Sequence, residues 1–327
     1  MPPTVGGAAR ARLDPFVAAI VITLLIGLAV RLPAGGQAAV AVVADVAIAV
    51  LFLFYGMRLR TTEVLASLRD ARLQGAILVA TFIVFPLVGL AASAVAEPIL
   101  GPGLARGLLF LSLLPSTVQS SVAMTGVARG NVAAAISGAT ISNVAGMLLT
   151  PLLVLLLMGQ DAAPGGGGVR AVLVQLLLPF AVGQVLQRWT GPWLRARRVL
   201  TLLVDRGAIL IVVFSAVTAA TAAGVWSAVT PWTIAALGLA CLTLLGVMLA
   251  ATWWAGGRLG LPTANRVVLM LCGSNKSLAT GLPMAGVLFP EATAATVAVP
   301  VILFHQFQLA LGAVIARRIG RGSPGAP

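Results

Sequence analysis

The sequence predicts an all-α membrane protein whose chain crosses the bilayer many times. Of its 327 residues, 60% are hydrophobic and only 9% are charged, and the mean hydropathy is +1.07. Soluble globular domains carry about 25% charged residues, so this composition excludes them. The apolar residues also form continuous runs instead of alternating with polar ones, which favours transmembrane helices over a transmembrane β-barrel.

Ten apolar runs are long enough to cross the bilayer as helices, and connections rich in Pro and Gly separate them. We expect these spans at residues 14–32, 38–56, 73–96, 105–128, 131–158, 169–188, 200–222, 231–256, 265–289 and 292–317. The first run follows Arg10 and Arg12, as the apolar part of a signal peptide does. No small-residue cleavage pattern comes directly after it, so an uncleaved first helix is favoured over a signal peptide.

The basic residues indicate the orientation of these spans. If the N-terminus is cytoplasmic, 17 of the 21 Lys and Arg residues flank cytoplasmic ends, and only Arg31, Arg106 and Arg170 flank outer ends. The positive-inside rule therefore predicts that both termini are cytoplasmic. Abundant Ala, Gly, Val and Arg beside a single Lys, Tyr and His is typical of a GC-rich bacterial genome, so we expect the bacterial cytoplasmic (inner) membrane.

The spans divide into two halves of five, at about 14–158 and about 169–317, and the second half inserts upside down because five is odd. The fourth span contains LFLSLLPSTVQSSVAMTG (Leu109–Gly126), and the ninth contains VVLMLCGSNKSLATGLPMAG (Val267–Gly286). Each is an apolar run, a polar break with Ser and Pro, and a second apolar run. Interrupted helices at matching positions of inverted halves indicate a transporter site. Coincidence is the alternative, because Ser and Pro are common in membrane helices.

The polar break of the ninth span holds Lys276, the only lysine of the chain. A charge at membrane depth is costly and usually marks a transport path or a buried partner. One interpretation is that Lys276 acts in transport, by attracting an anion or by loading and unloading a proton. The alternatives are a permanent charge that pairs with carbonyl oxygens and holds the broken helices together, or a lysine that snorkels to the surface.

The polar residues near the two breaks are the candidate site. Candidates for binding substrate or ions are Thr117, Gln119, Ser120 and Ser121 on the fourth span, Thr140 and Asn143 on the fifth, and Ser274, Asn275, Lys276 and Ser277 on the ninth. Buried amides and hydroxyls need hydrogen-bond partners, so each of these contacts either a ligand or exposed backbone. Asp45 and His305 are candidates for coupling. The alternatives are a water-facing Asp45 and a packed, hydrogen-bonded His305.

Three segments carry a family resemblance and occur in order along the chain: Leu51–Leu68 (LFLFYGMRLRTTEVLASL), Leu114–Leu153 (beginning LPSTVQSSVAMTGVARGN) and Cys272–Phe289 (CGSNKSLATGLPMAGVLF). They resemble the bile acid:sodium symporter (BASS) family, most closely its SBF-like bacterial branch. The resemblance implies a panel domain of spans 1, 2, 6 and 7 and a core domain of spans 3–5 and 8–10. It also implies that spans 4 and 9 unwind and cross near the bilayer centre, with substrate bound between core and panel.

The chain departs from the sodium-coupled members of that family at their ion sites. Those members hold two sodium ions with oxygen ligands on spans 4, 5 and 9, including a glutamate in the ninth. Here the ninth span has no acid and carries Lys276, and Ala135 and Ala139 stand where the family has hydroxyl ligands. An ammonium has only N–H donors, so it cannot bind a metal ion. One hypothesis is therefore that Lys276 replaces sodium. The alternative is that nearby Ser137, Thr140, Ser142 and Asn143 substitute for the missing ligands.

The resemblance implies a secondary active transporter of a small organic anion, with a cation gradient as the driving force and alternating access at the crossed helices. One alternative is a sodium-independent, proton-coupled carrier or exchanger that uses Lys276. Another is a non-transporting membrane regulator of ion homeostasis. The expected partners are the substrate and the lipid bilayer, with Na⁺ or H⁺ as the coupling ion and no cofactor or nucleic acid. No enzyme motif occurs, so the sequence predicts that the chain is not an enzyme.

Overall fold

A computed structural model describes residues 15–59, 70–159 and 172–322, and this part of the chain is helical and contains no strand. The elements are α1 (Pro15–Ala29), α2 (Ala34–Arg58), α4 (Ala71–Val79), η1 (Ala80–Val84), α5 (Phe85–Leu113), α6 (Val118–Val127), α7 (Val132–Met158), η3 (Val172–Leu177), α9 (Leu178–Ala196), α10 (Arg198–Ala222), η4 (Val225–Ala228), α11 (Pro231–Arg258), α12 (Thr263–Ser274), α13 (Leu278–Leu288) and α14 (Glu291–Gly322). Among these, η1 and η3 are π-helices and η4 is a 3₁₀-helix.

Six helical stretches in the described residues are long and apolar enough to cross a membrane, which confirms the prediction of an all-helical membrane protein. They are Ala34–Arg58, Ala71–Leu113, Val132–Met158, Arg198–Ala222, Pro231–Arg258 and Glu291–Arg321, and a shorter apolar helix covers Ala18–Ala29. The other predicted spans fall on α9 and on the interrupted pairs α5–α6 and α12–α13. Ten crossings in two inverted repeats therefore stay a prediction. Five arginines used to predict the orientation lie outside the described residues, namely Arg10, Arg12, Arg60, Arg69 and Arg170.

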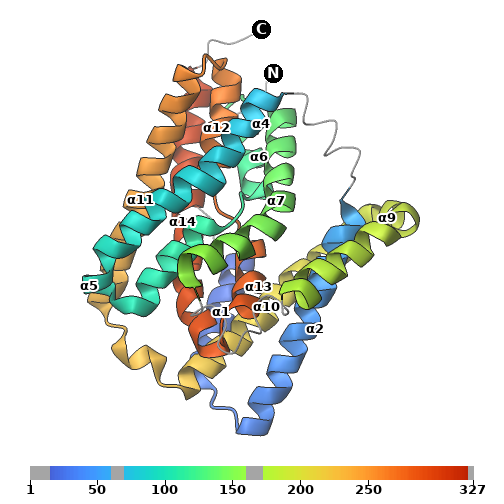
Figure 1. The fold of residues 1–327 in the computed structure, drawn as a ribbon, viewed down its shortest axis with the longest axis vertical. Helices are drawn as coiled ribbons and strands as arrows, with labels where there is room; N and C mark the ends of the chain where they lie inside the picture. The colour runs from blue at the N-terminus through green and yellow to red at the C-terminus, as the bar shows by residue number, and fades with distance from the viewer. Residues whose placement is uncertain (1–14, 60–69, 160–171, 323–327) are drawn as a thin grey trace, which may run out of the picture.

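The long helical stretch of α4, η1 and α5 reverses direction within α5 (Figure 1). The turn is at Gly101, whose φ of 75° is a left-handed conformation that favours glycine, and Pro102 follows it. The part of α5 after this turn leads back toward α6, and the chain is non-helical between them, at 114–117. A second break separates α12 from α13, at 275–277. The two breaks touch, because the Ser277 amide donates to the Pro115 carbonyl (2.9 Å).

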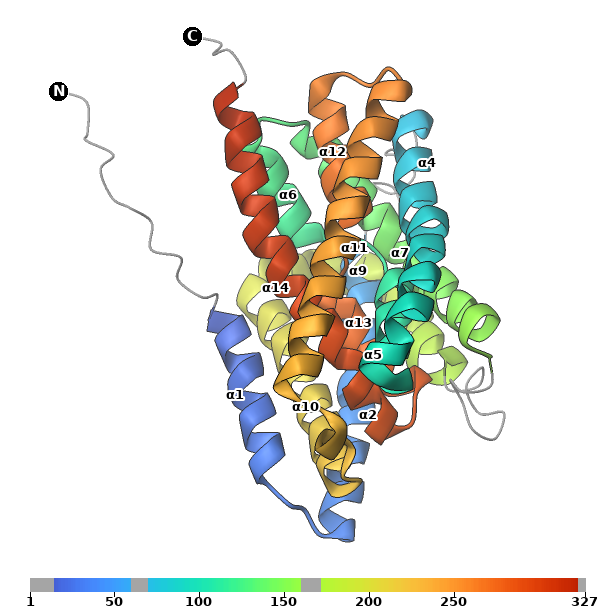
Figure 2. The same ribbon diagram turned by 90° about the vertical axis from the view of Figure 1, so that its left-hand side faces the viewer.

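The helices form two groups around these breaks. Helices α1, α2, α9 and α10 pack on one another, and we call them the four-helix group. The remaining helices surround the two breaks, and we call them the crossing group (Figures 1 and 2). Figure 2 shows α1 alongside α10 and α14 running the length of the crossing group. A shared apolar core joins both groups, since buried residues such as Ile48, Phe110 and Met284 belong to one cluster.

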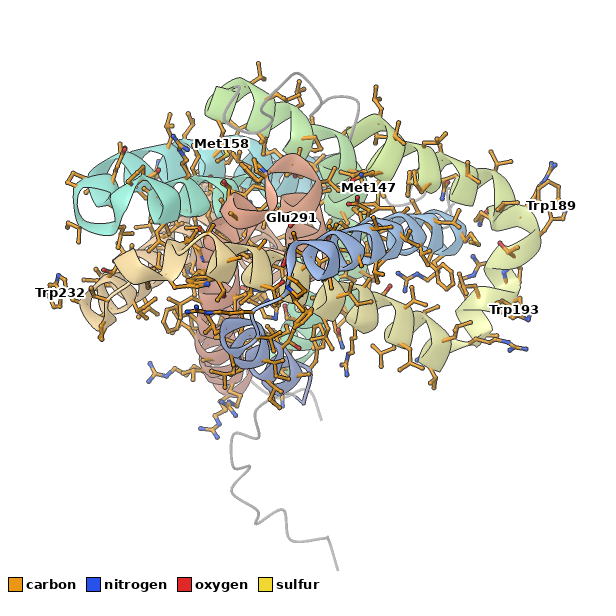
Figure 3. All side chains as sticks on the ribbon, turned by 90° about the horizontal axis from the view of Figure 1, so that it is seen from below. Met147, Met158, Trp189, Trp193, Trp232 and Glu291 are labelled. Carbon is orange, nitrogen blue, oxygen red and sulfur yellow. The ribbon has the colours of Figure 1, made fainter. Side chains whose placement is uncertain are left out.

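Exposed tryptophans mark the outer edges of the molecule. Seen from below, Trp189 and Trp193 project from one side and Trp232 from the opposite side (Figure 3). The guanidinium of Arg188 lies 3.7 Å from the ring centroid of Trp189, and that of Arg197 lies 4.3 Å from Trp193. Exposed Trp beside Arg is typical of side chains at the membrane–water interface.

Glycines allow α2 and α9 to approach closely. A Cβ atom at Gly56 would run into the Phe180 carbonyl oxygen, and one at Gly183 would run into the Leu53 carbonyl oxygen. The Gln184 side-chain amide donates to the carbonyl oxygen of Gly56 across the same contact (2.5 Å). Small residues and interhelical hydrogen bonds are how membrane helices associate, since lipid supplies no hydrophobic drive between them.

We expect Gly56→Ala to destabilise the protein, because the added methyl group must push two backbones apart. Overpacking of this kind costs about 1–3 kcal/mol. Gly75→Ala is the matched control, since a Cβ at this α4 glycine meets nothing within 4 Å and alanine favours a helix. Thermal unfolding of the purified proteins in detergent measures both. Equal Tm values for the two variants would contradict the close α2–α9 contact.

Candidate functional site

The break between α5 and α6 leaves backbone carbonyl groups without a hydrogen-bond partner inside either helix. The carbonyl oxygens of 112–116 all accept hydrogen bonds from elsewhere in the chain. Helix α7 supplies the Thr150 hydroxyl and the Asn143 amide, and the α12–α13 break supplies the Lys276 ammonium and the Ser277 backbone amide. Buried carbonyl groups need such partners, so the two breaks and α7 depend on one another.

The Lys276 ammonium lies at the centre of this arrangement. Its Nζ donates to the carbonyl oxygens of Thr81 (3.0 Å), Ser112 (2.8 Å) and Leu114 (2.6 Å). It also lies 4.1 Å from the centroid of the Phe85 ring, and the side chain is 1% exposed. An ammonium has three N–H donors, and three carbonyl acceptors use all of them. A neutral amine has only two donors, so this set of contacts, which we call the carbonyl cage, fits the charged form.

Local sequence explains why these carbonyls are available. In the π-helix η1, the Phe85 amide donates to the Ala80 carbonyl, five residues back. The Thr81 carbonyl would accept from residue 86 in the same pattern, but Pro86 has no N–H. Ser112 and Leu114 lie at the C-terminal end of α5, where carbonyl groups are unpaired and carry partial negative charge. The cage is therefore built from backbone positions that a proline and a helix end leave free.

Helix α14 holds the backbone of the α12–α13 break through Gln308. The Lys276 amide donates to Gln308 Oε1 (2.8 Å), and Gln308 Nε2 donates to the Lys276 carbonyl oxygen (2.9 Å). Gln308 Nε2 also lies 2.8 Å from His305 Nδ1. Gln308 is fully buried, so this paired contact fixes where Lys276 leaves the main chain.

Several predicted site residues of this break make structural contacts instead of facing a cavity. The Ser274 hydroxyl lies 3.1 Å from the Thr252 hydroxyl. The Asn275 amide donates to the Ser121 hydroxyl (3.0 Å), and both side chains are buried. Ser277 differs, because it caps the N-terminus of α13 and also lines a cavity.

A cavity of about 610 Å³ lies beside the crossing, between it and the four-helix group. Among the predicted site residues, Thr117, Gln119, Ser120, Thr140, Asn143, Ser277 and His305 line it. Ser121, Ser274, Asn275 and Lys276 lie behind this wall and do not line it. Asp45 is also absent from the lining, and its side chain is exposed halfway along α2. The volume is in the range of small-molecule sites. Whether these residues bind a ligand stays a prediction.

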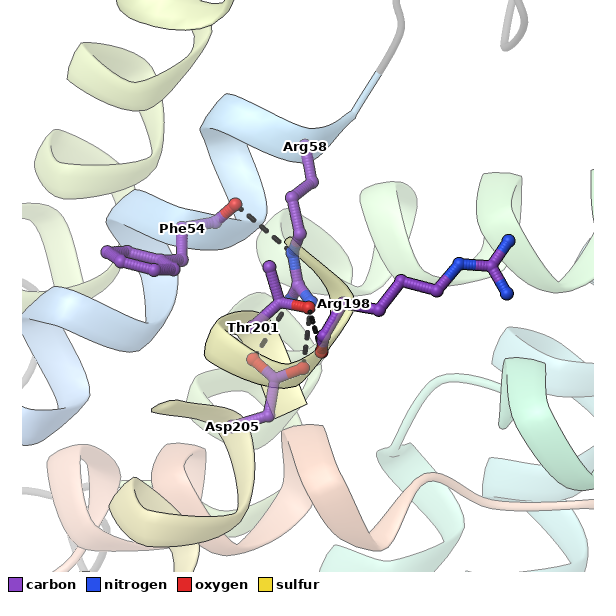
Figure 4. Close-up of polar contacts among 5 residues, drawn as sticks. All are labelled: Phe54, Arg58, Arg198, Thr201 and Asp205. Atoms are coloured by element: carbon purple, nitrogen blue, oxygen red, sulfur yellow. Dashed lines mark hydrogen bonds and ion pairs between the residues drawn. The ribbon is translucent and has the colours of Figure 1, made fainter. Parts of the chain in front are cut away.

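The facing wall of the cavity carries charges that the sequence analysis missed. The Arg58 guanidinium donates two hydrogen bonds to the Asp205 carboxylate, at 2.8 and 3.0 Å (Figure 4). Arg206 also lines the cavity, with its guanidinium 5.0 Å from the ring centroid of Phe16. The positive-inside rule counts these arginines only as charges that flank the ends of spans. Asp205 was the available signal, because it is an acid inside the predicted span at 200–222.

Comparison with known proteins places the chain among transporters. It matches the SBF-like CPA transporter family over residues 14–321. It is 42% identical over 314 residues to the uncharacterized protein PA2026 of Pseudomonas aeruginosa, covering 94% of this chain and 93% of that protein. It is 35% identical over 312 residues to the putative symporter YfeH of Escherichia coli K12, with coverages of 94% and 93%. Sodium/bile acid cotransporter 7 of Mus musculus is 26% identical over 286 residues, with coverages of 85% and 83%. These relatives confirm the predicted resemblance and the prediction that the chain is not an enzyme.

Lys276→Met is expected to destabilise the protein strongly. Methionine has a similar length but no donors, so three buried carbonyl groups lose their partner, at about 1–3 kcal/mol each. Thr81→Val is the matched control at the same place, because the Thr81 hydroxyl is buried without a partner and the substitution keeps the carbonyl. Thermal unfolding of the purified proteins should show a large fall in Tm for the first and none for the second. A Lys276→Met variant as stable as Thr81→Val would rule out the carbonyl cage.

Proposed function

The chain belongs to the SBF-like CPA transporter family, and we propose that it is a secondary active transporter that carries a small organic anion without sodium. The carbonyl cage around Lys276 is the observation that carries this proposal. An ammonium donating to three carbonyl oxygens, with no carboxylate in ion-pair contact among the described residues, supplies the crossing with a positive charge. A cation at that place stabilises the partial negative charge of the carbonyl groups, as a bound metal ion would otherwise do.

The arrangement of the helices supports alternating access. We propose that the four-helix group is the panel and the crossing group the core, in ten spans with both termini in the cytoplasm of a bacterial cell. The cavity lies between these two groups, where relative movement would expose it to one side and then the other. Arg58 ends α2 beside the cavity, and the positive-inside rule assigns that end to the cytoplasm. We therefore assign this conformation as inward-facing.

The crossing wall of the cavity suits one anionic group. Helix α6 begins there, and its N-cap Thr117 makes no side-chain hydrogen bond to the free amides of the first turn. Ser120 lines the same wall at 9% exposure, and its hydroxyl oxygen is itself buried without a partner among the described residues. Free amides at a helix N-terminus attract a carboxylate or phosphate oxygen. The Lys276 charge behind this wall favours the same sign of ligand.

The residues present do not fit sodium, although some relatives are named sodium/bile acid cotransporters. The carbonyl oxygens that would attract a cation are already bonded to Lys276 Nζ. Ala135 and Ala139 are fully buried on α7 and offer no side-chain oxygen. No group of three or more His, Cys, Asp or Glu side chains comes together in residues 15–59, 70–159 and 172–322. We therefore derive no step of transport through a sodium ion.

Proton coupling is the second candidate, and the isolation of Lys276 favours it. Since no carboxylate of the described residues lies in ion-pair contact with this ammonium, a proton gained or lost by the lysine changes the net charge of the crossing directly. The cage fits the protonated form, so proton release would require the crossing to open during the transport cycle. Proton exchange at Lys276 and a permanent charge make different predictions for the pH dependence of uptake.

We expect the purified protein in proteoliposomes to take up small carboxylates equally in sodium, potassium or choline buffers, within about 2-fold. The physical reason is that Lys276 already occupies the cation position. Lys276→Gln should reduce uptake at least 10-fold in all three buffers, whereas Thr81→Val should not. Uptake that requires sodium would contradict the proposal.

The same vesicles decide between the two candidates. A permanent Lys276 charge predicts that an imposed pH gradient leaves uptake by the wild-type protein unchanged. Proton coupling predicts acceleration by the gradient in the wild-type protein and no response in Lys276→Gln.

A further inference from the structure

We infer that the substrate carries two separated anionic groups, one bound at the crossing and the other at Arg206 on the opposite wall. This inference rests on the proposed function, because it assumes that the cavity holds the transported anion. It goes further by naming the substrate class, which is a dicarboxylate or a phosphorylated carboxylate, and by assigning a specificity-determining residue.

The charges around the cavity do not cancel. Its lining contains Arg58, Asp205 and Arg206 as charged side chains. Arg58 and Asp205 form a two-point ion pair, so the Asp205 carboxylate already has its counter-charge (Figure 4). Arg206 is the surplus, and no carboxylate of the described residues lies in ion-pair contact with it. The cavity therefore presents one positive charge that a ligand can neutralise.

Arg206 is placed to bind a ligand group. Its side chain is half-buried, and stacking against the Phe16 ring holds the guanidinium at the cavity wall without using its hydrogen-bond donors. A guanidinium presents a fork of N–H groups that matches two oxygens of a carboxylate or phosphate. A partly enclosed guanidinium with no acceptor among the described residues gains most from such a ligand, because the ligand replaces lost hydration.

The two anion-binding features lie on opposite walls. The α6 N-terminus and Ser120 belong to the crossing group, and Arg206 belongs to α10 of the four-helix group. A small monoanion can satisfy only one wall at a time. A substrate with an anionic group at each end satisfies both walls and ties the two helix groups together, which is the state from which they would move as a loaded carrier.

Matched pairs of ligands test this inference. The probes are butyrate against succinate and valerate against glutarate, with 3-phosphonopropionate and inorganic phosphate as further arms. Affinity is measured by ligand-dependent thermal stabilisation of the purified wild-type protein. We expect each dianion to bind at least 10-fold more tightly than its monocarboxylate. Succinate and 3-phosphonopropionate distinguish a carboxylate from a phosphate group as the second anion, and inorganic phosphate alone should bind weakly.

Arg206→Gln should erase this difference. We expect it to weaken dianion binding at least 10-fold and to leave monocarboxylate binding within about 2-fold, with little change in the Tm of the unliganded protein. Arg198→Gln is the matched control, because it removes the same charge from the same helix at an exposed side chain outside the cavity. It should bind every probe as the wild-type protein does.

The outcomes of these experiments distinguish failure of the two-anion inference from failure of the proposed function. Equal binding of mono- and dianions by the wild-type protein, or equal weakening of both by Arg206→Gln, would overturn the two-anion inference and leave the proposed function intact. Failure of every organic anion to bind or to enter proteoliposomes would overturn the proposed function and the inference with it.

Discussion

The hydrogen bonds from the Lys276 ammonium to three backbone carbonyls are the interaction on which the centre of this protein depends. Carbonyl groups without partners are costly inside a membrane protein, and so is a charge without a partner. Here the two groups stabilise each other. The end of α5 and Pro86 leave carbonyl acceptors free, and the Lys276 ammonium donates three hydrogen bonds to them. Charge-assisted bonds of this kind are about twice as strong as neutral ones.

This arrangement has a consequence for energetics. A bound sodium ion can dissociate on either side of a membrane and so links transport to its own gradient. A lysine cannot leave, so it supplies the same charge without contributing a gradient. Under the proposed function, the driving force would then come from a counter-transported solute or from protons. Relatives with different residues at the crossing need not share this property, since a fold does not fix the chemistry of its site.

The sequence predicts the helical class and the breaks well, because hydropathy and polar interruptions are strong local signals. Both breaks are marked by local composition, namely proline and serine at Pro115–Ser121 and the lone lysine in Leu271–Pro283. Pairing of Lys276 with carbonyl oxygens was one of the alternatives that the sequence offered, and the three contacts of its ammonium agree with it. Which carbonyls form the cage was not predictable, since backbone carbonyls exist at every residue and leave no trace in the sequence. Lys276 and Thr81 are also 195 residues apart.

Side-chain roles at the site were only partly predictable for a related reason. Polarity identified Ser274, Asn275 and Ser121, but it could not tell residues that satisfy one another from residues that face a cavity. On α10 the sequence analysis missed a residue that does line the cavity, Asp205, which lies next to Arg206 in the sequence. Its pairing with Arg58 spans 147 residues of sequence. The packing of α1, α2, α9 and α10 makes that wall of the cavity.

The most direct measurement of the central claim is cation rescue of a Lys276→Ala variant. This substitution removes the ammonium and leaves a space lined by the same three carbonyl oxygens. Thermal unfolding is followed while choline chloride is replaced by methylammonium or sodium chloride at constant ionic strength. If a tethered cation holds the crossing, the small cations raise the Tm of Lys276→Ala and leave the wild-type Tm unchanged. The account is contradicted if no cation stabilises the variant, or if sodium stabilises the wild-type protein to the same extent.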